Sequence, residues 1–214
     1  MKLNICVLGS SFSWRFVLSL LKLIIDLNDK DIDWNWCNAQ NANIYKGRDM
    51  VLQGEIFGKE DMKLFSGDPY DYILWIDSDQ VFEPDDVHKL IKADKQVIGG
   101  AIRQADMVYA CGEWDEKLLK EDKTTRRLDQ KILDKSEEPI LVGFTGFGFI
   151  LIKQGVYEQL KYPWHKALEY DIDGVFDQLS EDGSFFKQLR QLEIPVYIHP
   201  KVRIGHEKTF VIPG

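Results

Sequence analysis

The stretch Tyr72-Ile-Leu-Trp-Ile-Asp-Ser-Asp79 joins five consecutive apolar residues directly to a pair of carboxylic acids. A short apolar run between turn residues is typical of a strand buried on both faces. Here Gly67-Asp-Pro69 lies upstream and the two acids lie downstream. The stretch therefore predicts a buried strand over residues 72–76 at the centre of the fold.

Sequence patterns typical of further strands and helices lie on both sides of this strand. We expect further strands over residues 3–8, 96–98, 139–142, 147–152, 196–198 and 202–204, and helices over 14–27, 45–57, 84–92 and 181–192. Ser13 can cap the first helix, and Pro84 stands in a first turn, where its missing N–H costs nothing. Strands and helices in this order predict one α/β domain with a mostly parallel central sheet, flanking helices and a smaller mixed second sheet.

The composition excludes several classes of protein. The 214 residues carry 27 Lys and Arg against 35 Asp and Glu, a net charge of −8, without a basic block, so we expect no nucleic-acid partner. The longest apolar stretch, residues 16–27, is shorter than the ~20 residues that span a bilayer, so no membrane span is expected. Three cysteines without CxxC spacing favour reduced thiols and a cytoplasmic location.

Two segments bear on domain organisation. Residues 113–138 contain sixteen charged side chains among twenty-six, which predicts an exposed, mobile excursion with a hairpin around 123–126. The chain also stops soon after its last predicted strand. Either this is a natural terminus, or residues 1–214 are one domain of a longer polypeptide with further domains.

The carboxylates of Asp77 and Asp79 form the first candidate site. Residues i and i+2 of an extended chain share a face, so both acids can converge just past the carboxyl end of the strand, where α/β sheets bind ligands. Two close carboxylates repel each other unless a cation lies between them, which favours Mg²⁺ or Mn²⁺. Alternatively, they only cap N–H groups of a turn. An EF-hand is excluded because Val81 and Phe82 occupy the next required positions.

Two later features bear on the same site. His206, after the last predicted strand, would add an imidazole that suits Mn²⁺ better than Mg²⁺, or it is a solvated loop residue. Glu181 and Asp182 open the last predicted helix, where the helix dipole favours acids. An acid at the mouth of a pocket is also what a general base requires, so both interpretations stay open.

The order of these motifs resembles that of GT-A-fold, nucleotide-sugar-dependent glycosyltransferases of the DxD type. The resemblance covers residues 3–207 and rests on Asp77-Ser-Asp79, Gly143-Phe-Thr-Gly-Phe-Gly148, Glu181-Asp182 and Ile204-Gly-His206. It implies a Rossmann-like fold and transfer of a hexosyl or deoxyhexosyl group from a nucleoside-diphosphate sugar, with a UDP-sugar favoured, to a glycan or glycoprotein. The chain also resembles chlorella-virus members that glycosylate the major capsid protein, which would place it in the host cytoplasm.

The resemblance also implies a role for individual residues. The nucleotide would contact Gly9, Ser11, Phe12, Arg48, Asp77, Ser78 and Arg103, the sugar would contact Gly146, the metal would bind Asp77, Asp79 and His206, and the acceptor would face Asp182 beside Glu181. The loop after the first strand is Gly9-Ser-Ser-Phe-Ser13 and lacks the Pro and Asn frequent in the largest family. The identity of the base therefore stays open.

The implied reaction builds negative charge on the leaving phosphate, which a divalent ion would neutralise. Arg103, Lys201 and Arg203 could assist as further cations, or they are surface charges. Asp182 is the candidate base if the anomeric centre inverts, and it orients a substrate if the centre is retained. Trp164 could stack on a sugar, although a buried structural role is favoured.

Other functions also fit parts of the sequence. Asp77-Ser-Asp79-Gln-Val81 resembles the motif of haloacid-dehalogenase-type phosphohydrolases, but that motif normally ends the first strand, and here another strand and two helices precede it. A nucleotidyltransferase would need a Gly-rich basic loop after the first strand, which this chain lacks. A non-catalytic carbohydrate-binding module remains the alternative outside the enzymes.

Overall fold

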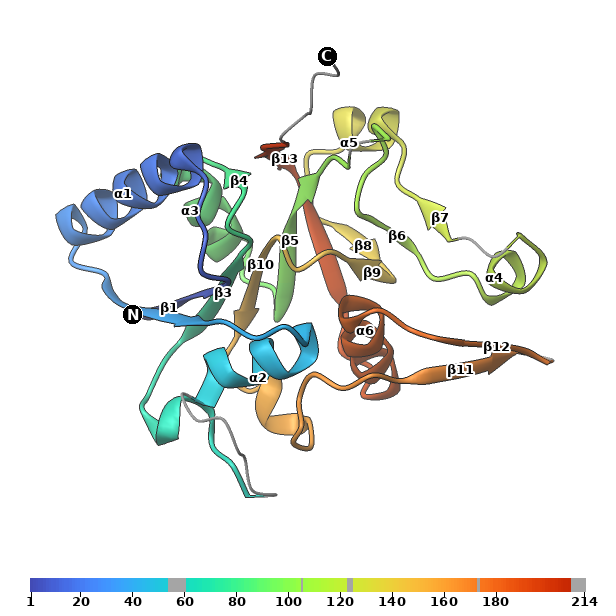
Figure 1. Ribbon diagram of the computed structural model, residues 1–214. Coiled ribbons are helices and arrows are strands. Elements are labelled where there is room, and N and C mark those ends of the chain that lie inside the picture. The colour runs from blue at the N-terminus through green and yellow to red at the C-terminus, as the bar shows by residue number, and fades with distance from the viewer. Residues whose placement is uncertain (54–60, 105, 123–124, 173, 209–214) are drawn as a thin grey trace, which may run out of the picture.

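The protein is described here from a computed structural model that covers residues 1–53, 61–104, 106–122, 125–172 and 174–208. A central sheet of eight strands has the order β2-β1-β3-β10-β5-β13-β4, with β8 paired to β13 (Figure 1). The bounds of its strands are β1 (Lys2–Leu8), β2 (Asp33–Ala39), β3 (Tyr72–Ile76), β4 (Gln80–Val81), β5 (Val97–Ile102), β8 (Ile140–Val142), β10 (Phe149–Lys153) and β13 (Val196–His206).

Five of these strands, β1, β2, β3, β5 and β13, run in one direction, whereas β10, β4 and β8 run against them. The predicted mostly parallel sheet is therefore confirmed. Helices α1 (Trp14–Asp29) and α3 (Pro84–Lys92) contribute to an apolar core on one face of the sheet. Helices α2 (Ile44–Gln53) and α6 (Glu181–Gln191) contribute to a second core on the other face.

Local signals place several elements where the sequence predicts them. Strand β3 is buried at every residue. The Ser13 hydroxyl accepts a hydrogen bond of 3.1 Å from the N–H of Phe16 and so caps α1, as expected. The last predicted turn of the second helix, residues 54–57, lies outside the described residues. Strand β2 was not predicted, because its Asp-Trp-Asn-Trp-Cys-Asn-Ala sequence is too polar for a buried strand.

Strand β13 contains a bulge that decides which side chains reach each face. His199 pairs with Gly100 and Arg203 pairs with Ala101, so the three residues 200–202 have no partner on β5. Side chains alternate along a strand, and an odd number of extra residues reverses the alternation. Ile198 accordingly lies in the core with α2 and α6, whereas Ile204 lies in the core with α1 and α3. The two strands predicted at 196–198 and 202–204 are one bulged strand.

Most of the remaining elements lie on the right of the view in Figure 1, whereas the two 3₁₀ turns lie at the bottom, near α2. These elements are β6 (Cys111–Glu113), α4 (Glu116–Asp122), β7 (Arg126–Arg127), α5 (Gln130–Lys135), β9 (Phe144–Thr145), β11 (Glu169–Ile172) and β12 (Val175–Gln178), with 3₁₀ turns at Leu64–Gly67 and Tyr157–Gln159. Strands β7, β6 and β9 form a small antiparallel sheet rather than a mixed one, and β11 and β12 form a projecting hairpin. The charged segment 113–138 contributes Leu128 and Leu133 to the core, while part of its predicted turn lies outside the described residues.

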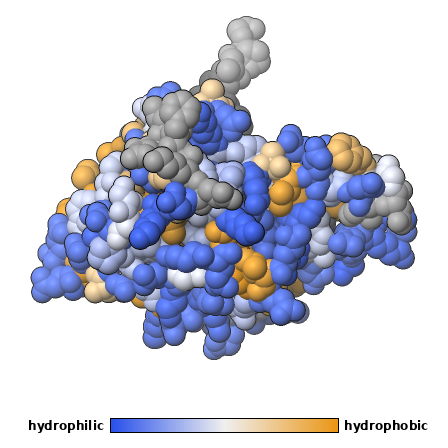
Figure 2. All heavy atoms as spheres, turned by 90° about the horizontal axis from the view of Figure 1, so that it is seen from below, coloured by the Kyte–Doolittle hydropathy of each residue, from blue (hydrophilic) through white to orange (hydrophobic). Residues whose placement is uncertain are grey.

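The surface is mostly hydrophilic on the face seen from below, where hydrophobic areas are small and separate (Figure 2). A longer apolar stripe follows the outer side of α1, where Trp14, Leu18, Leu21 and Ile25 are exposed. Within the described residues, no helix is both long and apolar enough to cross a membrane.

Candidate functional site

The loop after β3 meets the end of β13 at one edge of the sheet. The Asp79 carboxylate oxygen Oδ2 lies 3.0 Å from Nε2 of His206, although the two residues are 127 positions apart in the chain. The ammonium group of Lys208 lies 3.1 Å from the same oxygen. The Asp79 carboxylate therefore contacts both an imidazole and an ammonium group from the C-terminal part of the sequence.

Backbone pairing fixes this meeting point. His206 is the register partner of Gln80 in the antiparallel pairing of β13 with β4, and the N–H of Glu207 donates to the carbonyl oxygen of Asp79 at 2.9 Å. The bulge in β13 sets the face toward which His206 projects. The imidazole is thus positioned by strand pairing rather than by a free loop.

The charge of Asp79 is held in place by its neighbours. Burial raises the pKa of this carboxyl group, but the hydrogen bond from Lys208 and the charge of His206 lower it by more, so its pKa falls below the ordinary value. Asp79 is therefore ionised at neutral pH. Its other oxygen, Oδ1, accepts a hydrogen bond of 3.0 Å from the Gln80 side chain.

The His206 ring lies between two hydrogen-bond acceptors. Its Nε2 faces Asp79, and its Nδ1 lies 3.3 Å from the carbonyl oxygen of Arg103. A neutral imidazole has a single N–H and can donate to only one of them. Either a second ring proton or a cation between Nε2 and Asp79 satisfies both contacts. An imidazole oriented by a carbonyl group and facing a carboxylate is a donor set that suits Mn²⁺.

Asp77 lies beside this pair but turns toward a different partner. Its N–H donates to the Gly148 carbonyl oxygen at 3.0 Å, and its Oδ1 lies 3.5 Å from Nη2 of Arg48. A Cβ atom on Gly148 would lie only 3.2 Å from the other Asp77 oxygen, so a residue without a side chain suits this approach. In the part of the chain that the structure describes, no three His, Cys, Asp or Glu side chains form a metal-binding group.

The loop after β1 is bonded to the acidic loop. The N–H of Ser13 donates to the carbonyl oxygen of Ser78 at 3.0 Å, and Gly9 adopts a φ of +124°, which favours glycine. Ser11 is exposed, and the ring of Phe12 lies beside that of Trp36, with 6.0 Å between their centroids. Both of these rings are more than one third exposed. Polar loop atoms and two exposed aromatic rings therefore adjoin the acidic loop.

Arg48 links the acidic loop to the start of α6. Its guanidinium group is buried between the rings of Trp75 and Phe147, at 5.0 and 4.5 Å from their centroids. Its Nη2 lies 3.5 Å from Asp77 and 3.5 Å from Glu181. Burial and the charge of Asp182 raise the pKa of Glu181, and Arg48 opposes this rise. One buried cation thus holds an acid from each of two predicted site segments.

Glu181 and Asp182 line a hollow of about 450 Å³. The Asp182 carboxylate accepts hydrogen bonds from the Ser180 hydroxyl and from the N–H of Gly183, the latter at 2.8 Å. Trp114 and Tyr170 also line this hollow, as does Ala110. A Cβ atom on Gly146 would lie 3.5 Å from Cβ of Ala110, which places Gly146 at the edge of the same region.

Some predicted residues lie elsewhere, and some participants were missed. The Arg103 side chain donates to Tyr109 and Gln130, its carbonyl oxygen faces His206, and the residue also lines a small hollow together with His206 and Lys208. Trp164 is buried, as the structural interpretation predicted. Lys208 and Trp36 were not predicted. The available signals were weak: Lys208 stands two positions after the candidate histidine, and Trp36 is an aromatic residue in a polar strand. Only the tertiary structure brings them to the site.

Comparisons with known proteins bear on the fold. No protein-family model matches the chain, and no curated protein matches it. The chain is similar to the structure of A197 from STIV, with a TM-score of 0.53 and 16% identity over 100% of this chain and 97% of that chain. It is also similar to the catalytic domain of Drosophila β1,4-galactosyltransferase 7 in complex with xylobiose, with a TM-score of 0.52 and 13% identity over 97% of this chain and 71% of that one.

A second structure of the Drosophila enzyme is a variant in complex with manganese, UDP-Gal and xylobiose, with a TM-score of 0.50 and 12% identity over the same shares of the two chains. A glycosyltransferase involved in glycosylation of the major capsid of PBCV-1 aligns with a TM-score of 0.42 at 10% identity over 99% of this chain and 95% of that one, and it carries no weight. At these identities the similarity shows the fold alone. The chain therefore has a GT-A-like α/β fold that glycosyltransferases share.

Proposed function

We propose that the chain is a metal-dependent glycosyltransferase that moves a sugar from a nucleoside-diphosphate sugar to a glycan or glycoprotein acceptor. The observation that carries this proposal is the meeting of Asp79 and His206 at 3.0 Å, beside the loop that Ser13 anchors to Ser78. A turn that used Asp79 only as a cap would have no need of an imidazole from the far end of the chain. The GT-A-like fold of the chain supports the same conclusion.

The metal site in this proposal consists of Asp79 and His206, with Asp77 close by. When bound, a Mn²⁺ or Mg²⁺ ion would supply positive charge for the two phosphates of the donor. Lys208 already places an ammonium group on the Asp79 oxygen, which shows that positive charge is favoured at this point. Arg48 holds Asp77 and balances its charge.

The nucleoside end of the donor belongs on the loop after β1 in this proposal. Gly9, Ser11 and Ser78 offer backbone and hydroxyl groups, while the exposed rings of Phe12 and Trp36 offer a stacking surface for a base. We favour a UDP-sugar because of the resemblance to DxD glycosyltransferases. The Drosophila enzyme, whose fold is similar, has been solved with manganese and UDP-Gal.

The acceptor belongs in the hollow beside the start of α6. Asp182 is held by the Ser180 hydroxyl and the Gly183 N–H, so its carboxylate is oriented before any substrate binds. It takes a proton from the acceptor hydroxyl if the reaction inverts the anomeric centre, and it orients a substrate if the centre is retained. Trp114 and Tyr170 line the same hollow and suit the face of a sugar ring.

The test is a thermal-shift screen of nucleoside diphosphates and nucleotide sugars with Mn²⁺ or with EDTA. A nucleotide at 100 times its Kd adds about 2.7 kcal/mol, or about 5–10 °C in Tm for a chain of this size. We expect one nucleotide to stabilise the protein only when metal is present. Asp79→Asn and His206→Ala should abolish the shift, whereas His199→Ala, on the same strand, should keep it.

Two results would contradict the proposal. If no nucleotide stabilises the protein, the donor site does not exist. If free sugars stabilise it equally with EDTA and in the Asp79→Asn variant, the chain is a carbohydrate-binding module instead.

A further inference from the structure

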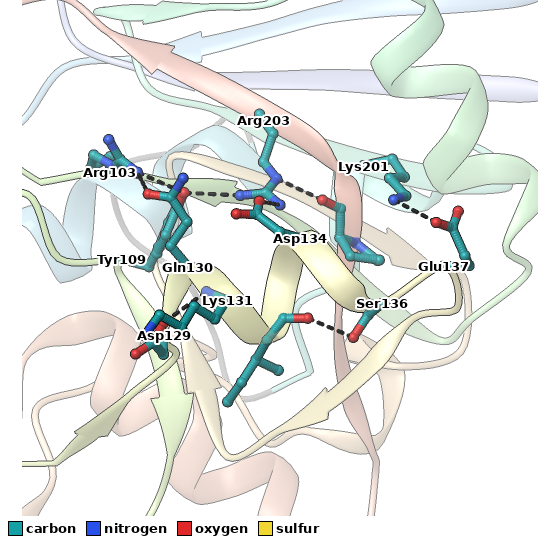
Figure 3. Close-up of polar contacts among 12 residues, drawn as sticks. Arg103, Tyr109, Asp129, Gln130, Lys131, Asp134, Ser136, Glu137, Lys201 and Arg203 are labelled. Atoms are coloured by element: carbon teal, nitrogen blue, oxygen red, sulfur yellow. Dashed lines mark hydrogen bonds and ion pairs between the residues drawn. The ribbon is translucent and has the colours of Figure 1, made fainter.

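A second hollow, of about 620 Å³, opens where the bulge of β13 departs from β5. Arg103 reaches it from the end of β5, and Lys201 and Arg203 reach it from β13. Helix α5 lies along it and contributes Gln130 and Asp134 (Figure 3). The function proposed above assigns no role to these side chains, although Arg103 is among the residues that the sequence predicts to contact the nucleotide.

Two guanidinium groups converge on one phenol in this hollow. The Tyr109 hydroxyl accepts hydrogen bonds from Nη2 of Arg103 at 3.1 Å and from Nη1 of Arg203 at 2.9 Å. The guanidinium carbons also lie 5.2 and 5.7 Å from the centre of the Tyr109 ring. Figure 3 shows both arginines pointing toward this buried tyrosine, which lies beside Gln130 at the start of α5. The neutral Tyr109 hydroxyl therefore bridges two positively charged guanidinium groups.

The acids near these arginines do not balance their charge. The hollow is lined by Arg103, Lys201 and Arg203 and by the acid Asp134, and a second acid, Glu137, pairs with Lys201 at 2.8 Å, so the sum is 3 − 2 = +1. Asp134 pairs with Arg203 at 3.0 Å. Arg103 donates to Tyr109 and Gln130, which are both neutral, and it forms no ion pair within the described residues. In a protein with a net charge of −8, this is a concentrated positive site.

We propose that this hollow binds a tetrahedral dianion, a phosphate or sulfate group, between Arg103 and Arg203. Planar guanidinium forks match the oxygens of such a group, and Arg103, whose charge no acid of the described residues balances, would supply its main ionic contact. The phosphate is either free or part of a phosphorylated substrate, and both share this chemistry.

The two polar side chains of α5 face one arginine each. Gln130 contacts Arg103 through its amide oxygen, and Asp134 contacts Arg203 through a carboxylate oxygen. Asp134 therefore competes with an anion for Arg203, whereas Gln130 leaves the charge of Arg103 available. A carboxylate at position 130 would pair with Arg103. Both guanidinium groups would then be occupied by acids of α5.

The site is distinct from the candidate metal pair but connected to it. The side chain of Arg103 lies in the hollow, while its carbonyl oxygen contacts Nδ1 of His206. The proposal does not depend on transferase activity, because phosphate binding can be measured without nucleotide or metal.

The test titrates the protein with inorganic phosphate in EDTA, at constant ionic strength, and follows amide NMR shifts or isothermal calorimetry. We expect saturable binding with shifts around Arg103, Tyr109 and Arg203. Gln130→Glu, an exposed substitution on α5, should weaken binding at least tenfold, and Asp134→Asn should tighten it several-fold. Lys135→Gln changes the net charge by the same amount as Gln130→Glu on the same helix, does not line the hollow, and should change the Kd by less than twofold.

Parallel titrations with sulfate and with a hexose phosphate distinguish binding of the free anion from binding of a phosphorylated substrate. Equal binding of phosphate and ester shows that the group alone is recognised, and preference for the ester points to a phosphorylated substrate. Absence of binding by all three overturns the proposal. So does equal weakening in Gln130→Glu and Lys135→Gln, because that is a general charge effect. Nucleotide-dependent stabilisation by Mn²⁺ should survive in Gln130→Glu, which separates failure here from failure of the proposed function.

Discussion

Two aspartates in this molecule each contact a histidine more than a hundred residues away, in opposite surroundings. Asp79 and His206 lie at the sheet edge, partly open to water, with their side chains 3.0 Å apart. Asp49 and His165 lie in the core, where the Asp49 carboxylate accepts a hydrogen bond of 2.9 Å from the backbone N–H of His165. The first contact joins two side chains that can bind a ligand, and the second fixes a loop.

The core pair is enclosed by aromatic residues. The His165 ring is stacked on Phe185, and its Nε2 lies 2.9 Å from the Tyr157 hydroxyl, which in turn accepts from Trp75 Nε1 at 3.0 Å. Burial and the charge of Arg48 lower the pKa of His165 well below its usual value. Burial also raises the pKa of Asp49 to about 7. Both groups are therefore held toward their neutral forms, whereas the neighbours of Asp79 keep it ionised.

The difference teaches that residue type alone does not identify a site. An aspartate and a histidine stabilise the fold where apolar groups exclude charge. The same two residue types are available for chemistry where a lysine and open solvent stabilise the charge. Four predictions test this distinction.

The largest effect should follow from removing the charge of Asp79. We expect Asp79→Asn to lower sugar transfer about 1,000-fold, equivalent to about 4 kcal/mol, because the donor phosphates lose their metal. Asp49→Asn should lower it less than threefold. The measurement is product formation with the donor that the thermal-shift screen identifies. Equal losses in the two variants would remove the functional distinction between the pairs.

Stability should show the reverse order. His165→Ala leaves a cavity among aromatic rings and removes the partner of Tyr157, which should cost about 3 kcal/mol in the free energy of unfolding. His206→Ala should cost less than about 1 kcal/mol, because its side chain is partly exposed. Urea unfolding followed by circular dichroism measures both. A larger loss in His206→Ala would show that the edge pair is structural.

The two acids should give pH dependences of opposite sign. Asp49 binds its proton more tightly in the folded state, so its contribution to stability is complete below pH 4 and is lost as the pH rises to about 7. The shift corresponds to at most about 4 kcal/mol, and relaxation around the charge should reduce this to about 2 kcal/mol. Asp79 has a lowered pKa, so its contribution is present above pH 4 and is lost as the pH falls through that lower value.

Urea unfolding of the wild type, Asp49→Asn and Asp79→Asn between pH 3 and pH 8 measures these slopes. Relative to Asp49→Asn, the wild type should lose stability as the pH rises from 4 to 7. A flat difference between these two proteins would mean that Asp49 is ionised throughout.

The smallest effect concerns the hydroxyl that joins the core network. Tyr157→Phe leaves Trp75 Nε1 and His165 Nε2 without their partner and should cost about 1–2 kcal/mol. Tyr170→Phe, a half-exposed control, should stay within about 0.5 kcal/mol. Equal values for the two variants would show that the network adds nothing to core stability.

Much of the fold could be predicted because its signals are local. Strand β3 is an uninterrupted apolar run, α1 has a serine cap, and α3 begins with a proline in its first turn. Strand β2 lacks such a signal, since its polar residues form a strand only through their pairing with β1. The hairpin of β11 and β12 was missed because each strand has only four residues, too few for the alternation of polar and apolar residues in Glu169–Ile172 to stand out.

The candidate site could be predicted only as a set of residue types. The order of motifs led to Asp79 and His206, and the structure brings these two together. The order of motifs could not show that Asp77 turns toward Arg48 or that the Arg103 guanidinium group donates to Tyr109. Those outcomes depend on which face each side chain occupies, and that is decided by pairing between distant strands.

The bulge of β13 leaves residues 200–202 without partners on β5, although Val202 is fully buried in the core. Removing two of them would leave one extra residue, and Arg203 and His206 would keep their present sides of the sheet. Removing all three would leave a regular strand in which Arg203 still pairs with Ala101, so the sides would again be kept. A shift of Arg203 by one position along β5 would exchange them, sending the imidazole away from Asp79 and the guanidinium away from Tyr109. Both sites therefore depend on the register of Arg203 with Ala101, and a change in the length of this segment should be tolerated as long as that register is kept.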